Sequence, residues 1–101
     1  MNVARYACMI VSFADPVTED LWISGKSRKI PARIHRVALR KLAQLHFAAR
    51  LDDLRAAPGN RLEALGGDRK GQHSIRINDQ WRICFQWLDD NAHDVQIVDY
   101  H

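Results

Sequence analysis

The sequence predicts one α+β domain, in which two or three helices pack on one face of an antiparallel sheet. Two regular patterns indicate this fold. Apolar residues recur at helical spacing over residues 31–49, whereas after residue 74 they alternate with polar residues, as in strands. The length agrees, because 101 residues suit one compact domain and leave no room for a second.

The N-terminal part is expected to hold a strand and a short helix. Residues 9–13 are rich in β-branched and other apolar side chains, which favours a strand. Pro16 after Asp15 is typical of a helix start, and Gly25 is expected to end that helix. Because Met9 could itself be the start codon, residues 1–8 are assigned to an N-terminal extension and residues 9–101 to the folded domain.

Residues 31–49 are expected to form the main amphipathic helix, and a shorter helical piece should follow at 51–55. The apolar stripe of the long helix consists of Ile34, Ala38, Leu42, Leu45 and Ala49. Its opposite side carries a positively charged face of Arg33, Arg36 and Arg40, with Lys29 just ahead of it. This face is either simply solvated or a ridge of cations that contact phosphates.

Three strands are expected in the C-terminal third, around residues 75–77, 81–87 and 95–98. The short loops 78–80 and 89–91 would join them into an antiparallel meander with one apolar face, which the long helix covers. Trp81 and Trp87 fall on the apolar face and are interpreted as core residues. Arg82 falls on the other face, where it would either pair with an aspartate such as Asp94 or Asp99 or grip a phosphate.

Charge is distributed unevenly along the chain. The total is +3, but residues 26–55 hold nine Lys and Arg against two Asp, which is net +7. Residues 79–101 hold one Arg against five Asp, which is net −4. A local basic field of this kind attracts polyanions, so the charge pattern favours a nucleic-acid partner.

Several function classes lack support in the sequence. Cys8 and Cys84 are far apart and there is no Cys/His cluster, so we expect no structural zinc, no disulfide framework and a cytoplasmic location. No apolar stretch is long enough to span a membrane, and we expect no membrane partner. Walker, dinucleotide-binding, zinc-protease and serine-hydrolase motifs are absent from the sequence.

Two segments could carry chemistry. The chain ends in Asp99, Tyr100 and His101, which crowd a carboxylate, a phenol and an imidazole at the end of a predicted strand. The alternative for these residues is a frayed tail without function. The glycine-rich segment 66–71 contains Arg69 and Lys70, and it is either a phosphate-contacting loop or an ordinary basic turn.

Residues 61–101 resemble the C-terminal half of HigB-type toxins, which belong to the RelE-like superfamily and are the toxic partners of bacterial toxin-antitoxin systems. The most specific matches are GDRKG at 67–71, SIRINDQWRI-x-F at 74–85 and DYH at 99–101. Upstream, the segments 9–13 and 30–49 are similar to the family's opening strand and helical section. The chain differs from many relatives at Gly66, where they have lysine, and from some at Glu63, where they have histidine.

The resemblance implies a small RelE-like α+β domain that acts as a ribosome-dependent endoribonuclease and cleaves mRNA in the ribosomal A site. It implies no metal and no organic cofactor, and a helix-turn-helix antitoxin similar to HigA as the partner. By position, Asp99, Tyr100 and His101 match the family's functional triplet and Arg82 matches its phosphate-contacting arginine. The expected RNA contacts are Arg33, Arg36, Arg40, Arg69, Lys70, Arg76 and Gln80.

The residues and the resemblance suggest one mechanism. The ribose 2′-hydroxyl attacks the adjacent phosphate, His101 or Asp99 assists proton transfer, and Arg82 neutralises the charge that develops. Tyr100 would stack on or orient the nucleotide. Two other functions stay open at this point: a toxin of the same fold that blocks a protein such as DNA gyrase, and an inactive relative that only binds RNA.

Overall fold

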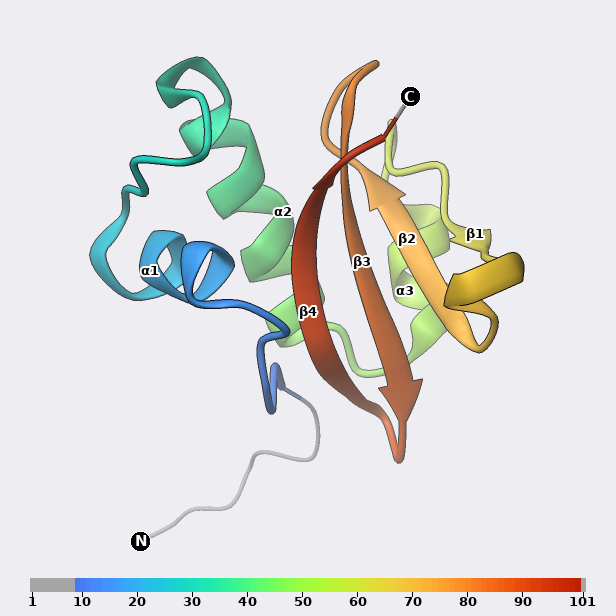
Figure 1. Cartoon of the computed structure of the whole chain (residues 1–101). Helices are drawn as coiled ribbons and strands as arrows, with labels where there is room; N and C mark the ends of the chain where they lie inside the picture. The colour runs from blue at the N-terminus through green and yellow to red at the C-terminus, as the bar shows by residue number, and fades with distance from the viewer. Residues whose placement is uncertain (1–8, 101) are drawn as a thin grey trace, which may run out of the picture.

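The computed structural model describes residues 9–100. Three helices and a four-stranded antiparallel sheet of order β1-β2-β3-β4 form an α+β domain, which confirms the predicted fold class. Figure 1 shows α1 and α2 beside the sheet, with α2 between α1 and the strands, and α3 behind β2 and β3. The proposed extension at residues 1–8 and the terminal His101 lie outside the described residues.

Helix α1 (Pro16–Ser24) begins and ends where the sequence predicts. The Asp15 carboxylate caps it by accepting a hydrogen bond from the Thr18 amide at 2.8 Å. Gly25 ends it in the left-handed conformation, at φ 85°, which an L side chain rarely adopts. The buried Thr18 hydroxyl accepts a hydrogen bond from the Ile97 amide at 3.0 Å, so α1 is fixed to the last strand of the sheet.

The segment 9–13 pairs with the sheet without becoming a regular strand. Ile10 and Phe13 form isolated parallel bridges with Ala92 and Val95. Between these bridges the partner strand has a bulge at Asp94, whose φ is +53°. A bulge disrupts the ladder of hydrogen bonds, so pairing is restricted to the two ends of this short segment.

The predicted helix 31–49 is shorter and begins with a tighter turn. A 3-10 turn, η1 (Ala32–Ile34), precedes α2 (His35–Phe47), and α3 (Leu51–Ala56) follows after an extended Ala48. The predicted core positions in the stripe are buried from Ile34 to Leu45, but Ala49 is exposed because α2 ends before it. Ala48 is buried in its place.

The sheet contains one strand more than predicted. Strands β2 (Gln72–Arg76), β3 (Trp81–Leu88) and β4 (Asn91–Asp99) form the predicted meander, and β1 (Glu63–Ala64) adds a two-residue edge. Two residues are too few to produce an alternating pattern, so the sequence gives no signal for β1. A second 3-10 turn, η2 (Gly67–Arg69), lies between β1 and β2.

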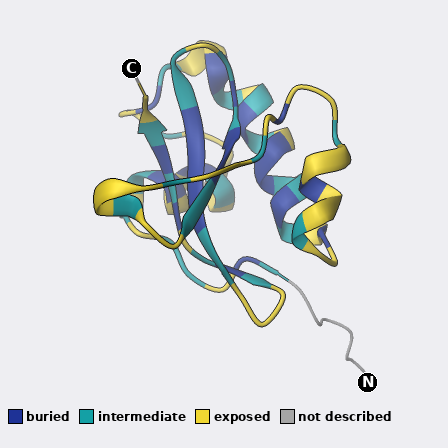
Figure 2. Cartoon of the chain, turned by 90° about the vertical axis from the view of Figure 1, so that its right-hand side faces the viewer, coloured by how far each residue is buried: buried dark blue, intermediate teal, exposed yellow. Residues whose placement is uncertain are grey.

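The hydrophobic core lies between the helices and one face of the sheet. Ile75, Ile83 and Ile97 lie side by side across β2, β3 and β4, and they share one buried cluster with Leu42 of α2 and Leu54 of α3. Figure 2 shows the buried residues concentrated in α2 and the central strands. Trp81 and Trp87 are half-buried against this cluster, as predicted. No helix in the described part of the chain is long and apolar enough to cross a membrane.

Candidate functional site

The candidate site lies where β2 ends, β3 begins and β4 ends. Arg82 is the second residue of β3 and lies between Arg76 on β2 and Val98 on β4. Just beyond β4, the Tyr100 amide donates a hydrogen bond to the Gln80 carbonyl at 2.5 Å. The antiparallel register therefore brings the candidate residues of three segments to one end of the sheet.

The Arg82 side chain is buried and fixed by hydrogen bonds to neighbouring residues of the chain. The residue is 9% exposed, its Nε donates to Ser74 Oγ at 2.7 Å, and its Nη2 donates to the Arg61 carbonyl at 2.7 Å. A buried guanidinium is stable only when such partners replace water. Two of its three nitrogens are thus committed to neighbours, which fixes the position of the charge.

The ion-pair partner of Arg82 is Glu63 of β1, with 3.6 Å between Nη2 and Oε1, and not Asp94 or Asp99 as the sequence suggested. Asp94 is instead exposed in the bulge of β4. Glu63 is opposite Ser74 in the register of β1 and β2, so both residues face the guanidinium. The Glu63 side chain is about half-exposed, which leaves its carboxylate accessible from solvent.

Tyr100 covers Arg82 from the other direction. The guanidinium carbon lies 5.6 Å from the centre of the phenol ring, within the range of a cation–π contact. Tyr100 itself is 38% exposed, so part of the residue remains accessible to solvent. An aromatic ring in this position can both shield the arginine and contact a nucleotide base.

Asp99 and Gln80 form a separate pair at the same end of the sheet. Gln80 Nε2 donates to Asp99 Oδ2 at 3.2 Å. Asp99 is opposite Trp81 in the register, whereas Arg82 is opposite Val98, so Asp99 and Arg82 belong to opposite faces of the sheet. The candidate residues therefore gather at the end of the strand, as predicted, but Asp99 and Arg82 do not share one face. His101 lies outside the described residues.

Arg76 adds a second cation beside Arg82. Its Nη2 pairs with the exposed Asp79 carboxylate, and its amide donates to the Asn60 carbonyl at 2.6 Å. Two arginines directly opposite each other repel. Their separate carboxylates, Asp79 and Glu63, offset this repulsion and allow the positive charge to be concentrated at one place.

The structure shows a buried ammonium behind this site that the sequence reasoning missed. Lys41 of α2 is 4% exposed, and its Nζ donates to Oδ1 of Asn60 at 2.5 Å. Burial is the main cause that lowers the pKa of Lys41, and the nearby Arg40 and Arg76 lower it further. Lys41 lies three residues after Ala38 and four before Leu45, so helical spacing places it on the apolar stripe. This spacing is the sequence signal from which its burial could have been predicted.

Asn60 is the centre of a hydrogen-bond network that joins α2 to the site. It is fully buried, and its Nδ2 donates to Gln44 Oε1 at 3.0 Å and to the Leu54 carbonyl at 3.1 Å. The next residue is Arg61, in the left-handed region at φ 47°, whose carbonyl holds Arg82. The buried asparagine therefore anchors the segment on which Arg82 depends.

In the basic turn at 66–71, Arg69 is hydrogen-bonded to the sheet, whereas Lys70 is exposed. Arg69 donates from Nη1 to Gln72 at 3.0 Å and from Nη2 to Gln96 at 3.1 Å, which holds η2 against the sheet. Lys70 is exposed. Cys84 lies beneath this turn, where burial raises the pKa of its thiol despite the opposing effect of Arg69 and Arg82.

The three arginines predicted to form a positive face are all exposed on η1 and α2: Arg33, Arg36 and Arg40. Arg40 precedes the buried Lys41 in the chain, and its charge contributes to the lowered pKa of Lys41. Within residues 9–100, no group of three His, Cys, Asp or Glu side chains is arranged to hold a metal ion.

Comparison with known proteins adds independent evidence. A family model described as the RelE-like toxin of the type II toxin-antitoxin system HigB matches residues 10–101. Toxin HigB-1 of Vibrio cholerae is 44% identical over 82 residues, which cover 80% of this chain and 86% of that protein. Endoribonuclease HigB of Proteus vulgaris is 32% identical over 94 residues, which cover 92% of this chain and 100% of that protein.

Proposed function

The chain belongs to the HigB-like family of RelE-like toxins of type II toxin-antitoxin systems, and on this premise we propose that it is an endoribonuclease that cleaves mRNA in the ribosomal A site. An antitoxin partner follows from the family, since a type II system pairs a toxin with an antitoxin. We infer that this partner is a helix-turn-helix protein similar to HigA and that cleavage takes place in the cytoplasm, where the substrate is translated.

The observation that carries the proposal is the fixed charge of Arg82. The guanidinium is buried, bonded to Ser74 and the Arg61 carbonyl, and covered by the Tyr100 ring. A charge that is already oriented needs no reorganisation when negative charge develops on a phosphate, so it stabilises the transition state more than a mobile side chain would. Arg82 would thus act as a fixed positive charge and not as a free two-pronged clamp.

The proposed reaction is a transesterification at one phosphate of the mRNA, which the ribosome would hold in place. The ribose 2′-hydroxyl attacks the adjacent phosphorus, its proton passes to a base, and the 5′-oxygen leaves with a proton from an acid. The products are a 2′,3′-cyclic phosphate and a 5′-hydroxyl. His101 or Asp99 would carry one of these two protons and a water molecule the other; because Asp99 belongs to the opposite face of the sheet from Arg82, it would have to act around the end of β4. Tyr100 would orient the nucleotide next to Arg82. Lys70, Arg69, Arg76 and Gln80 border the RNA.

The exposed arginines of the helical layer would dock the toxin on ribosomal RNA. Arg33, Arg36 and Arg40 are exposed on one helical segment, and Arg40 is close enough to Lys41 to affect its pKa. Such contacts with phosphates depend strongly on salt, so docking should weaken as ionic strength rises.

The test is primer-extension mapping of a message translated by purified ribosomes, with the protein tagged at its N-terminus so that the C-terminal groups stay free. We expect cleavage at A-site codons with the wild-type chain and loss of cleavage with Arg82→Ala, while ribosome binding is largely retained. Arg55→Ala is the matched control, because Arg55 is an exposed arginine of α3 that pairs with Asp52 and is not among the partners of Arg82.

Other outcomes would reject the proposal in different ways. Full-length translation together with inhibited DNA gyrase would identify a toxin that blocks a protein target. Ribosome binding by a folded wild-type chain without any cleavage would identify an inactive RNA-binding relative. Loss of ribosome binding by Arg82→Ala would mean that Arg82 docks the protein and does not act on the scissile phosphate.

A further inference from the structure

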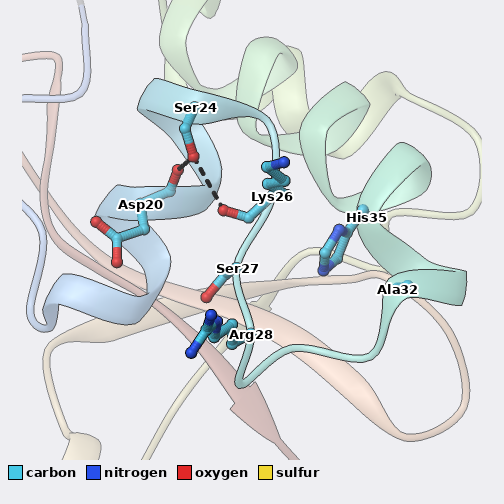
Figure 3. Close-up of a pocket in the computed structure, with 7 residues that line it drawn as sticks. All are labelled: Asp20, Ser24, Lys26, Ser27, Arg28, Ala32 and His35. Carbon is cyan, nitrogen blue, oxygen red and sulfur yellow. Dashed lines mark hydrogen bonds between the residues drawn. The ribbon is translucent and has the colours of Figure 1, made fainter.

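A second place suited to phosphate lies away from the cleavage end of the sheet. It is a pocket of about 700 Å³ between the C-terminal end of α1, the loop 25–31 and η1. Figure 3 shows its lining, and in Figure 1 the loop lies on the far side of α2 from the sheet. The lining residues are Asp20, Ser24, Lys26, Ser27, Arg28, Ala32 and His35.

The walls of this pocket are held in place by the fold. Ser24 Oγ lies 2.7 Å from the Asp20 carbonyl and 3.1 Å from the Lys26 carbonyl, so it ties the loop to α1. Ile30 is buried and anchors the other end of the loop. The pocket is therefore present before any ligand arrives, which reduces the entropy lost on binding.

The loop presents cations that have no carboxylate partner in the described structure. None of the ion pairs within residues 9–100 involves Lys26 or Arg28. Residues 26–36 contain five Lys and Arg and no Asp or Glu. The pocket thus combines a concave shape with two cations, Lys26 and Arg28, against the single carboxylate of Asp20, and this net positive charge favours a phosphate ligand.

His35 adds a directed polar group. Its Nε2 lies 2.7 Å from the Ile30 carbonyl, and because a carbonyl only accepts, Nε2 carries the proton. The Nδ1 atom is then left for a ligand. In Figure 3 the imidazole borders the pocket from the side of α2, while Ser27 and Arg28 extend into it from the loop.

Asp20 gives the pocket its asymmetry. Its carboxylate, at the α1 side, would repel a phosphate but can accept a hydrogen bond from a hydroxyl group. A ribose–phosphate unit satisfies both requirements, since its phosphate meets Lys26 and Arg28 and its 2′-hydroxyl meets Asp20. A volume of about 700 Å³ is of the size that holds a ligand as large as a nucleotide.

We propose that the pocket between α1 and η1 binds a ribose–phosphate unit of an RNA strand, at a site separate from the cleavage site. Only the choice of RNA over other phosphate ligands rests on the proposed function. The pocket would hold the RNA on the helical side of the molecule while the reacting phosphate occupies the end of the sheet. It would thereby add affinity and a preference for RNA over DNA without taking part in the reaction.

The test measures binding without ribosomes, using the fluorescence anisotropy of a labelled RNA 12-mer and of DNA with the same sequence, with intact RNA verified on a gel. Arg28→Gln should weaken RNA binding about tenfold and reduce the slope of log affinity against log salt by about one. Arg55→Gln, which removes the same charge from an exposed arginine on α3, should change the affinity less than twofold. Asp20→Ala should reduce the preference for RNA over DNA.

Adenosine 5′-monophosphate and inorganic phosphate, added as competitors, distinguish the sources of the phosphate. The proposal predicts that adenosine 5′-monophosphate, which carries both the ribose and the phosphate, displaces the RNA at a lower concentration than inorganic phosphate does, and equal displacement by the two would assign the pocket to a free phosphate ligand. Equal losses of RNA affinity with Arg28→Gln and Arg55→Gln, or no loss of affinity with Arg28→Gln, would refute the proposed RNA site. Cleavage by the Arg28→Gln variant is measured separately, at saturating ribosomes. This measurement distinguishes a failure of the pocket proposal from a failure of the proposed ribonuclease function.

Discussion

The buried network around Asn60 provides the sharpest test of how the candidate site is supported. Asn60→Ala removes the acceptor of the Lys41 ammonium and the donor to Gln44 and to the Leu54 carbonyl. An ordinary hydrogen bond contributes about 1 kcal/mol, and one to a charged group about 1.5–3 kcal/mol. Because the ammonium would stay buried without its partner, we expect a loss of about 3–5 kcal/mol in the free energy of unfolding.

The assay is urea unfolding followed by far-UV circular dichroism. A domain of this size is stable by about 5–15 kcal/mol, so the expected loss is a large part of the total and should lower the melting temperature by more than about 10 °C. The double variant Lys41→Met, Asn60→Leu replaces both polar partners by apolar side chains and should recover most of that loss.

Two results would refute the reasoning. A loss below about 1 kcal/mol for Asn60→Ala would mean that the ammonium finds water or another partner. A double variant less stable than Asn60→Ala would mean that the cost comes from packing and not from the unpaired charge. Where the double variant folds, its cleavage activity reports whether the Arg61 carbonyl still holds Arg82 in position.

Four further outcomes are expected. Because the pKa of Lys41 is lowered in the folded chain, the unfolded chain binds more protons, so the free energy of unfolding should rise as the pH increases towards about 10.4. Urea midpoints should show this rise in the wild type and less of it in Lys41→Met. In a Cys8→Ser variant, the remaining Cys84 thiol, buried and with a raised pKa, should react with a thiol reagent only in urea; rapid reaction of this variant in its native state would contradict the burial of Cys84. Glu63→Gln removes the carboxylate that faces Arg82 and should strengthen RNA binding about two- to fivefold in anisotropy, whereas weaker binding would show that Glu63 does not screen the arginine. His101→Gln should slow cleavage at A-site codons about 100-fold with ribosome binding retained, and unchanged cleavage would remove His101 from the mechanism.

Much of the candidate site follows from local sequence. The alternation of strands β3 and β4 placed Arg82 on the face opposite the core, and the position of Tyr100 one residue beyond β4 placed it at the same end. These placements depend only on the two-residue period of a strand and on hairpin pairing. The same rules also put Asp99 on the other face from Arg82, a consequence that becomes visible once the register is known.

The partners of Arg82 could not be read in the same way. Glu63 reaches it from a strand of two residues, and Arg61 offers a backbone carbonyl from a left-handed turn, neither of which has a sequence signal. The aspartates named as possible partners, Asp94 and Asp99, both belong to the neighbouring strand β4. Ion pairing depends on distance through space, and the edge strand brought a glutamate closer.

The sequence by itself determined the class of fold, the core faces of its main helix and strands, and the concentration of positive charge in residues 26–55, because each is set by periodicity or composition. Only the tertiary structure decided that Lys41 is buried against Asn60, that Arg82 is fixed between Glu63 and Tyr100, and that the basic loop borders a pocket. The physical reason is that burial and hydrogen bonding depend on which segments, distant along the chain, are in contact in the folded protein. Periodicity and composition do not specify these contacts.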